Sequence, residues 1–176
     1  MNFQKSFQDS LQILQLKEQA IHSVANDKSA LRPALILLGG GVLATTLGLI
    51  IFPIQMGMIT YRLDLFSLIG ALLGAYIMQI LGLALVGFLA QKFFSSKLTV
   101  EQFVKVMGHA GVINVLGVVP GLGALASLWT LVVLWKVLSS EGKMELGSIL
   151  ILLFVLLVLF SWMSFYTFQG RMGMMF

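Results

Sequence analysis

The sequence predicts an all-α, polytopic membrane protein with five transmembrane helices, preceded by an N-terminal amphipathic helix. Of its 176 residues, 59% are hydrophobic and only 10% are charged, which is too little charge to cover a water-soluble domain of this size. The charges are also segregated, because the ranges 33–61, 65–91, 106–135 and 146–170 contain no Asp, Glu, Lys or Arg. About 20 apolar helical residues cross a bilayer core. Since these ranges are apolar on every side, we expect helices rather than alternating barrel strands.

Three of the uncharged ranges each hold one predicted helix. The boundaries that we expect are about 35–59, 65–91 and 146–168. Pro33 lies near the first turn of the first helix, where a missing amide hydrogen is tolerated. Residues 169–176 form a short C-terminal tail.

The third uncharged range needs two helices. It runs from 106 to 135, so it has 30 residues, and a single helix of that length would reach about 45 Å, well beyond the bilayer core. The pair Pro120-Gly121 in its middle is typical of a turn, so we predict helices at 99–118 and 121–138, with Lys105 and Lys136 extending to the interface. A hairpin that does not cross the bilayer, and one kinked helix, are the alternatives.

Residues 1–32 form a polar segment that we place in the cytoplasm. Between Phe3 and Ala25 apolar residues recur at helical spacing, while the glutamines lie mostly on the other side. This pattern predicts an amphipathic helix, although Glu18 interrupts its apolar stripe. Such a helix lies in the membrane interface or packs under the bundle; alternatively, it docks a partner protein through its spaced apolar residues.

Lysine and arginine lie mostly on one side of the predicted bundle. With five spans and a cytoplasmic N-terminus, two lie outside, Arg62 and Arg171, as the positive-inside rule requires. The nine inside are Lys5, Lys17, Lys28, Arg32, Lys92, Lys97, Lys105, Lys136 and Lys143. We therefore expect the cytoplasmic (inner or plasma) membrane, with the C-terminus outside. The same distribution accounts for the net charge of +4, so we expect no nucleic-acid partner.

The predicted spans offer little chemistry. His109 is the one candidate for an ionisable side chain at membrane depth, and we expect a neutral imidazole hydrogen-bonded within the bundle. The other histidine, His22, lies in the polar segment, so no metal site is expected. No catalytic constellation is found at membrane depth, the chain contains no cysteine, and we predict neither an enzyme nor a cofactor.

Uncharged polar and small residues point to helix packing. Asn114 is expected to form interhelical hydrogen bonds or, alternatively, to line a substrate pathway; the same holds for Gln55, Gln79, Ser127 and Thr130. Gly70 and Gly74 form a GxxxG pair, and Gly123 and Ser127 a weaker pair of the same spacing. Such pairs predict close helix contacts within one chain or between two copies.

Several segments of the chain together suggest a family. They are LKEQAIHSVANDKSA at 16–30, PALILL at 33–38, VLGVVPGLG at 115–123 and LWTL at 128–131. They are similar to the polar lead-in, first helix, proline–glycine turn and tryptophan-bearing fourth helix of the Yip family. These are five-span membrane proteins of the Ypt/Rab-interacting type, and the chain most closely resembles their bacterial branch. The resemblance covers roughly 14–160, and the turn motif falls on Pro120, Gly121, Gly123 and Trp129.

The chain departs from the family pattern in the helix before that turn. The family usually has an aromatic residue at the position of His109, and often a proline within 111–113. The resemblance implies a five-helix bundle with a cytoplasmic N-terminal region. Eukaryotic relatives serve vesicle traffic through small GTPases and each other, but the resemblance assigns that GTPase interaction to no residue of this sequence.

Three functions fit a protein of this kind. The first is a non-enzymatic membrane protein that organises partners or lipids through helix packing. The second is a small transporter or channel subunit, and the third an intramembrane enzyme. No carboxylate and no acid–base constellation is expected at membrane depth, which favours the first. Its expected partners are the lipid bilayer and a second membrane protein or another copy of the chain.

Overall fold

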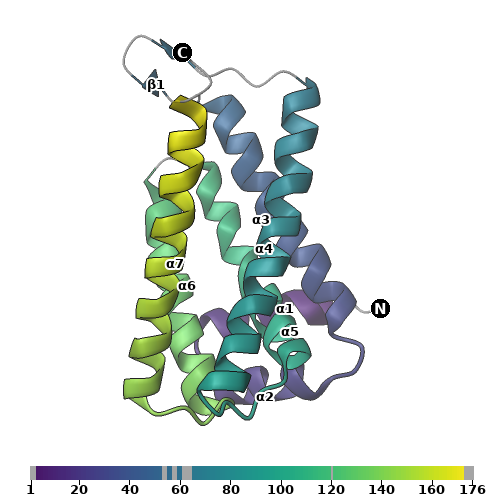
Figure 1. Cartoon of the computed structure of the whole chain (residues 1–176). Coiled ribbons are helices and arrows are strands. Elements are labelled where there is room, and N and C mark those ends of the chain that lie inside the picture. Colours follow the sequence, from purple (N-terminus) through teal and green to yellow (C-terminus); the bar gives the residue numbers. More distant parts are fainter. Residues whose placement is uncertain (1–2, 53–54, 57–58, 61–64, 120, 173–176) are drawn as a thin grey trace.

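The computed structural model describes residues 3–52, 55–56, 59–60, 65–119 and 121–172, and these are almost entirely helical (Figure 1). The prediction of an all-α fold is therefore confirmed, apart from one small hairpin. In chain order the elements are α1 (Phe3–Leu14), α2 (Glu18–Asn26), α3 (Leu31–Ile51), β1 (Gln55–Met56), β2 (Ile59–Thr60), α4 (Leu65–Phe93), α5 (Val100–Ala110), the 3₁₀ helix η1 (Gly111–Val118), α6 (Leu122–Ser140) and α7 (Leu146–Met172).

The N-terminal segment forms two helices, so the prediction of one helix between Phe3 and Ala25 was wrong. Leu16 adopts a left-handed backbone conformation with φ 61°, which ends α1 and turns the chain into α2. This conformation is unfavourable for a leucine by about 1–2 kcal/mol. The turn lets both helices bury apolar residues, with Ile13 of α1 and Ile21 of α2 fully buried.

The first long helix starts and ends earlier than the predicted 35–59. It begins at Leu31 because Pro33 lies in its first turn, where the helix needs no amide hydrogen. It ends at Ile51, and Phe52 has φ −124° and ψ 78°. The residue after Phe52 is a proline, and proline disfavours the helical conformation of the residue before it. β1 and β2 then pair antiparallel, Gln55 opposite Thr60.

The predicted third helix at 99–118 is divided in two. Thr99 starts α5 with a capping box, since its side chain accepts a hydrogen bond from the Gln102 amide and the Gln102 side chain accepts one from the Thr99 amide. After Ala110 the chain continues as η1, a 3₁₀ helix that packs along α3. Lys105 does not extend freely to the interface as expected: it is buried, and its Nζ lies 2.7 Å from Glu101 Oε1.

Helix α3 and the α5–η1 segment approach each other so closely that glycine is required between them. A Cβ on Gly41 would overlap the carbonyl oxygen of Gly111, and a Cβ on Gly117 would lie 2.8 Å from Thr45 Oγ1. Such close backbone approach is typical of small-residue interfaces between membrane helices. The closely packed α3–η1 pair makes the most extensive contact between elements of the described chain.

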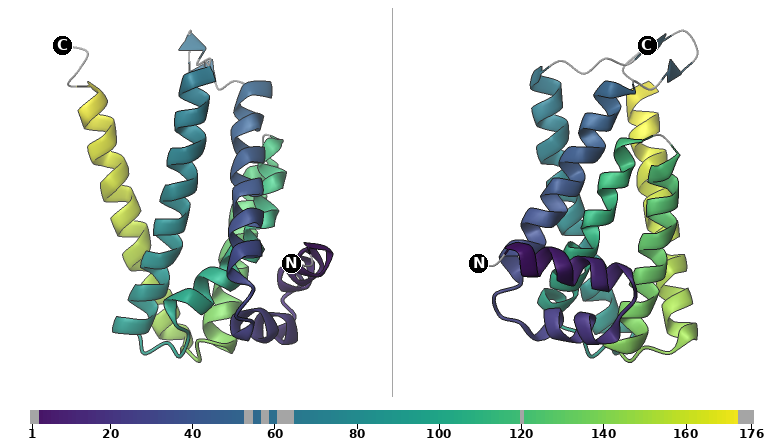
Figure 2. Two further views of the ribbon diagram at one scale, coloured as in Figure 1. Left: turned by 90° about the vertical axis from the view of Figure 1, so that its right-hand side faces the viewer. Right: turned by 180° about the vertical axis from the view of Figure 1, so that it is seen from behind.

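The helices pack tightly at one end and separate toward the other. α1, α2 and α5, which we call the platform, lie together at the end where the described chain begins, and the described chain ends at the opposite end (Figures 1 and 2). α4 and α7 diverge from the other helices away from the platform (Figure 2). The end of η1 and the start of α6 lie short of the far ends of α3 and α4 (Figures 1 and 2). Fully buried core residues, such as Phe103, Val137 and Ile149, gather on the platform side.

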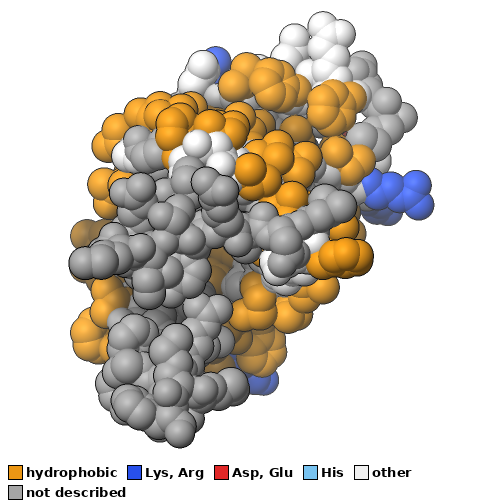
Figure 3. Space-filling model, turned by 90° about the horizontal axis from the view of Figure 1, so that it is seen from above, with side chains coloured by type: hydrophobic (Ala, Val, Ile, Leu, Met, Phe, Trp, Pro, Cys, Tyr) orange, Lys and Arg blue, Asp and Glu red, His pale blue; other side chains and the backbone are white. Residues whose placement is uncertain are grey.

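Three helices of the described chain are long and apolar enough to cross a membrane. They are Leu31–Gly48 within α3, Phe66–Phe93 within α4 and Leu122–Ser140 of α6, and α7 contributes the shorter apolar stretch Leu146–Leu159. Seen from the end opposite the platform, the described surface is mostly hydrophobic, with basic side chains at its edges (Figure 3). Large apolar side chains are also exposed along the helices, such as Leu73 of α4, Leu125 of α6 and Phe154 of α7, and such a surface suits contact with lipid rather than water.

Candidate functional site

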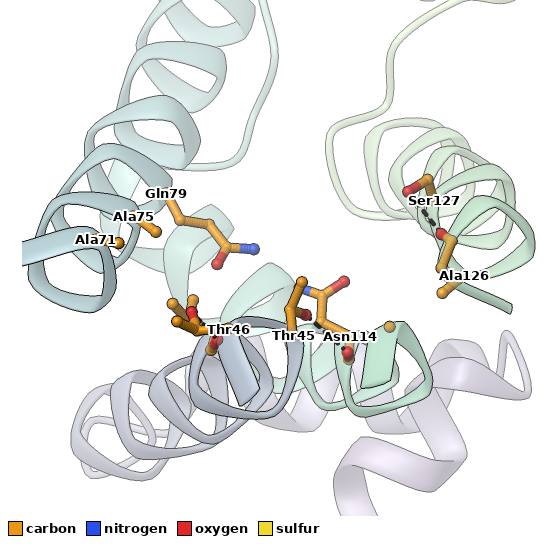
Figure 4. Close-up of a pocket in the computed structure, with 11 residues that line it drawn as sticks. Thr45, Thr46, Ala71, Ala75, Gln79, Asn114, Ala126 and Ser127 are labelled. Atoms are coloured by element: carbon orange, nitrogen blue, oxygen red, sulfur yellow. Dashed lines mark hydrogen bonds between the residues drawn. The ribbon is translucent and has the colours of Figure 1, made fainter. Parts of the chain in front are cut away.

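A cavity of about 370 Å³ lies between α3, α4, η1 and α6, where the helices begin to separate (Figure 4). Each helix contributes small or uncharged polar residues to its wall. These are Val42, Thr45 and Thr46 of α3, Ala71, Ala75 and Gln79 of α4, Asn114 and Gly117 of η1, and Gly123, Ala126 and Ser127 of α6. The lining contains no charged side chain, so the cavity has polar chemistry without a titratable group.

The hydroxyl groups of this cavity are satisfied by nearby backbone carbonyls. Thr45 Oγ1 lies 3.0 Å from the carbonyl oxygens of both Gly41 and Asn114, and the second of these bonds joins α3 to η1. Thr46 and Ser127 each donate to the carbonyl four residues earlier. Thr45 was not singled out in the sequence, because only the fold brings it against Asn114.

The two amide side chains of the cavity differ from the hydroxyls. Gln79 and Asn114 point into the space between the helices from α4 and η1 (Figure 4). Neither side chain has a hydrogen bond to any described residue, so their donors and acceptors are available to something in the cavity. The expected interhelical bonds of Asn114 therefore come from its backbone carbonyl and not from its side chain.

The residues of the proline–glycine turn take separate roles. Pro120 lies outside the described residues. Gly121 has φ +86° just before α6, a conformation that L side chains rarely adopt. Gly123 lines the cavity, and Ser127 donates to its carbonyl at 2.9 Å.

Trp129 attaches α6 to the platform. Its Nε1 donates a hydrogen bond of 3.0 Å to the carbonyl oxygen of Leu14, the last residue of α1. That carbonyl is one of the four at the end of α1 that have no partner within the helix. Trp129 of α6 therefore caps the C-terminal end of α1.

Polar pairs that were not recognised in the sequence complete this attachment. Lys136 of α6 forms an ion pair with Glu18 at the start of α2. Glu141, after α6, lies 3.1 Å from His22 Nδ1 of α2. These partners are more than 100 positions apart in the sequence, so no local pattern could identify them.

His109 lies in the platform, away from the cavity of Figure 4. It is 1% exposed, and its Nδ1 lies 2.9 Å from the carbonyl oxygen of Lys105. Because a carbonyl only accepts, Nδ1 carries the proton, and Nε2 is the acceptor of the neutral ring. The structure does not bring His109 and Asn114 into one site.

Gly70 and Gly74 face away from the described chain. A Cβ added to either would meet no described atom within 4 Å. Their predicted role in helix packing therefore stays a prediction, and it requires a partner surface that does not belong to the described residues. The close contacts within the chain involve Gly41, Gly111 and Gly117 instead.

Comparison with known families decides the identity of this helical bundle. The model of the Yip1 domain matches residues 12–166, which cover α2 to most of α7 and include both the cavity and Trp129. The chain belongs to the Yip1 domain family. The predicted family is thereby confirmed, and with its apolar helices this Yip1-domain chain is a membrane protein. No curated protein and no solved structure matches the chain.

Proposed function

We propose that this Yip1-domain chain is a non-catalytic membrane protein that holds a lipid or a helix of a membrane partner in the cavity between α3, α4, η1 and α6. The observation that carries this proposal is the pair Gln79 and Asn114, whose amides point into an uncharged cavity without a described hydrogen-bond partner. A polar group left unsatisfied in an apolar medium costs several kcal/mol. A bound group with donors and acceptors, such as a lipid ester or a partner's polar side chain, removes that cost.

The proposed topology has five passes, a cytoplasmic N-terminus and an outside C-terminus, in the inner or plasma membrane. Three observations support it: the platform lies at one end of α3, the described chain ends at the other, and basic residues concentrate on the platform side. If η1 and α6 form a hairpin that does not cross fully, the orientation of α3, α4 and α7 is unchanged.

Site-specific photo-crosslinking tests the occupant of the cavity. A photoreactive amino acid at Ala75 lies in the cavity wall, whereas one at Leu81 lies on the same helix outside the cavity lining. Mass spectrometry of crosslinked membranes is expected to show one discrete lipid or protein adduct at position 75 and a mixture of bulk lipids at position 81. Gln79→Leu with Asn114→Leu is expected to remove the discrete adduct. The same mixture at both positions would contradict the proposal.

A transporter or channel subunit is the second candidate, because polar groups at this depth are also suited to passage of a small solute. Flux through liposomes containing the purified chain separates the two functions. Solute-dependent flux that Asn114→Ala abolishes, without a stable adduct at position 75, would favour transport.

A further inference from the structure

A second cavity, of about 720 Å³, lies at the platform end of the molecule, between α1, α2 and the start of α3. Unlike the cavity of Figure 4, it is strongly charged. Lys5 and Asp9 of α1, Asp27 and Lys28 of the α2–α3 loop, and Arg32 of α3 line it, together with His109. Three cations and two carboxylates give it a net charge of one positive unit.

The start of α3 offers hydrogen-bond donors to this cavity. Ala30 precedes the helix and provides no side-chain cap, and within the described chain the amides of Leu31 and Arg32 donate to no carbonyl. Pro33 has no amide hydrogen. Unpaired amides and the helix dipole favour a negative group at this position, and the side chains of Lys28 and Arg32 add positive charge beside it.

Acceptors from three other elements line the same cavity. His109, nine-tenths or more buried, presents a neutral ring whose Nδ1 is bonded to Lys105 O, which leaves Nε2 as an acceptor. Asp27 Oδ1 accepts from the amide and hydroxyl of Ser29, each at 2.7 Å. These bonds hold the pKa of Asp27 below its ordinary value, so the carboxylate is charged at neutral pH. Together with Asp9, the His109 ring and the Asp27 carboxylate offer acceptors to a positively charged hydrogen-bond donor.

The position of the cavity relates it to the membrane surface. α3 is a candidate spanning helix that begins at Leu31, so its first turn falls at the level of lipid headgroups. α1 lies across the bundle beside this turn (Figure 2). Phe3, Phe7 and Leu11 of α1, spaced four residues apart, are 42–50% exposed, whereas Lys5 and Asp9 of the same helix line the cavity. One flank of α1 therefore suits acyl chains and the other suits a headgroup.

We propose that this cavity binds the phosphoethanolamine headgroup of a membrane phospholipid. The phosphodiester lies against the Leu31 and Arg32 amides and the Lys28 and Arg32 side chains, and the ammonium group donates to Asp9, Asp27 and His109. A singly charged phosphate with an attached ammonium suits the mixed lining better than a doubly charged free phosphate does. The inference goes beyond the proposed function and does not depend on what fills the cavity at Gln79.

Retention of defined lipids by the purified full chain tests this assignment. The chain in mild detergent is mixed with dioleoyl phosphatidylethanolamine, phosphatidylcholine or phosphatidylglycerol, and bound lipid is counted by native mass spectrometry. Phosphatidylethanolamine is expected to bind about tenfold more tightly than phosphatidylcholine, because the trimethylated ammonium of choline cannot donate hydrogen bonds to the carboxylates. Equal binding of all three lipids, or preference for phosphatidylglycerol, would overturn the proposal.

Matched variants locate the effect. Lys28→Gln with Arg32→Gln is expected to weaken phosphatidylethanolamine binding about tenfold, and Asp9→Asn to remove the preference over phosphatidylcholine. Lys92→Gln and Lys97→Gln alter exposed cations outside the cavity and are expected to bind as the unaltered chain does. Circular dichroism confirms that each variant is folded. If the Lys92 and Lys97 variants lose as much binding, or inorganic phosphate displaces the lipid at equal concentration, the headgroup site is wrong. Crosslinks from position 75 report separately on the other cavity.

Discussion

Single atoms decide how closely α3 and η1 can pack. Gly41 and Gly40 are neighbours on α3, yet only Gly41 meets η1: a Cβ on Gly41 would overlap the Gly111 carbonyl, whereas one on Gly40 would meet no described atom within 4 Å. The same contrast separates Gly117, which lies against Thr45, from Gly70 and Gly74. Glycine spacing alone therefore does not identify the packed face, because the sequence contains 18 glycines and only the docking of helices selects among them.

Replacing Gly41 by alanine is expected to destabilise the protein by about 1–3 kcal/mol, since the backbone on both sides has to move apart. Gly40→Ala is the control and is expected to be neutral or slightly stabilising, because alanine favours the helix. Unfolding in mixed micelles with increasing SDS measures both variants. Equal loss of stability in the two would show that the α3–η1 contact is looser than described.

The indole of Trp129 is expected to hold the end of α1 in place. Trp129→Phe keeps the ring but removes the N–H that reaches the Leu14 carbonyl, a loss of about 1 kcal/mol. Amide hydrogen exchange is expected to accelerate in α1 and little elsewhere. Trp135→Phe on the same helix serves as the control, because the Trp135 indole is about as exposed as that of Trp129 but has no hydrogen bond to a described residue, and identical exchange in both variants would contradict the capping role.

At the scale of elements, α2 is attached to the bundle through charge. The Lys136 side chain beside Glu18 lowers the pKa of that carboxyl below its ordinary value of 4.5, through a hydrogen bond and through charge attraction. A carboxyl whose pKa is lowered on folding stabilises the folded state above its unfolded pKa, and this contribution is lost as pH falls through the folded value.

The contribution of the Glu18–Lys136 pair to the attachment of α2 is therefore expected to weaken below about pH 4.5. Limited proteolysis of the 15–17 linker across the range from pH 3 to 8 measures the effect. Glu18→Gln removes the titrating group and is expected to abolish its share of the pH dependence, leaving that of Asp27. An unchanged pH profile in Glu18→Gln would exclude the ion pair as the cause.

Element types were largely predictable, but their ends and their divisions were not. The uncharged ranges located all the long helices, because apolar length is a local property of the chain. The break at Leu16 and the change from α5 to η1 at Gly111 were missed. Both depend on partners from elsewhere: burial of Ile13 and Ile21 stabilises the first, and contact with α3 accompanies the second.

At the scale of the whole molecule, the termini of the described chain lie at opposite ends, which predicts opposite sides of the membrane. An alkaline phosphatase fused after Phe176 is expected to be active, since this enzyme requires the outside compartment. The chain contains no cysteine, so Ser95→Cys in the α4–α5 loop provides a clean second label, expected to react only after the membrane is opened. Activity of a C-terminal reporter in the cytoplasm alone would reverse the orientation.

The sequence alone determines that this is a helical membrane protein of the Yip type. The length of the apolar segments, the segregation of the charges and the turn motif are all properties of residues that are close together in the sequence. Only the folded chain decides which of its many small and polar residues form sites. Gln79 and Asn114 come from different helices, and the charged platform cavity joins α1, the α2–α3 loop, α3 and His109. The physical reason is that whether a segment forms a membrane helix depends on its neighbours along the chain. A site depends instead on how separate helices are rotated and positioned along the bundle axis when they pack together.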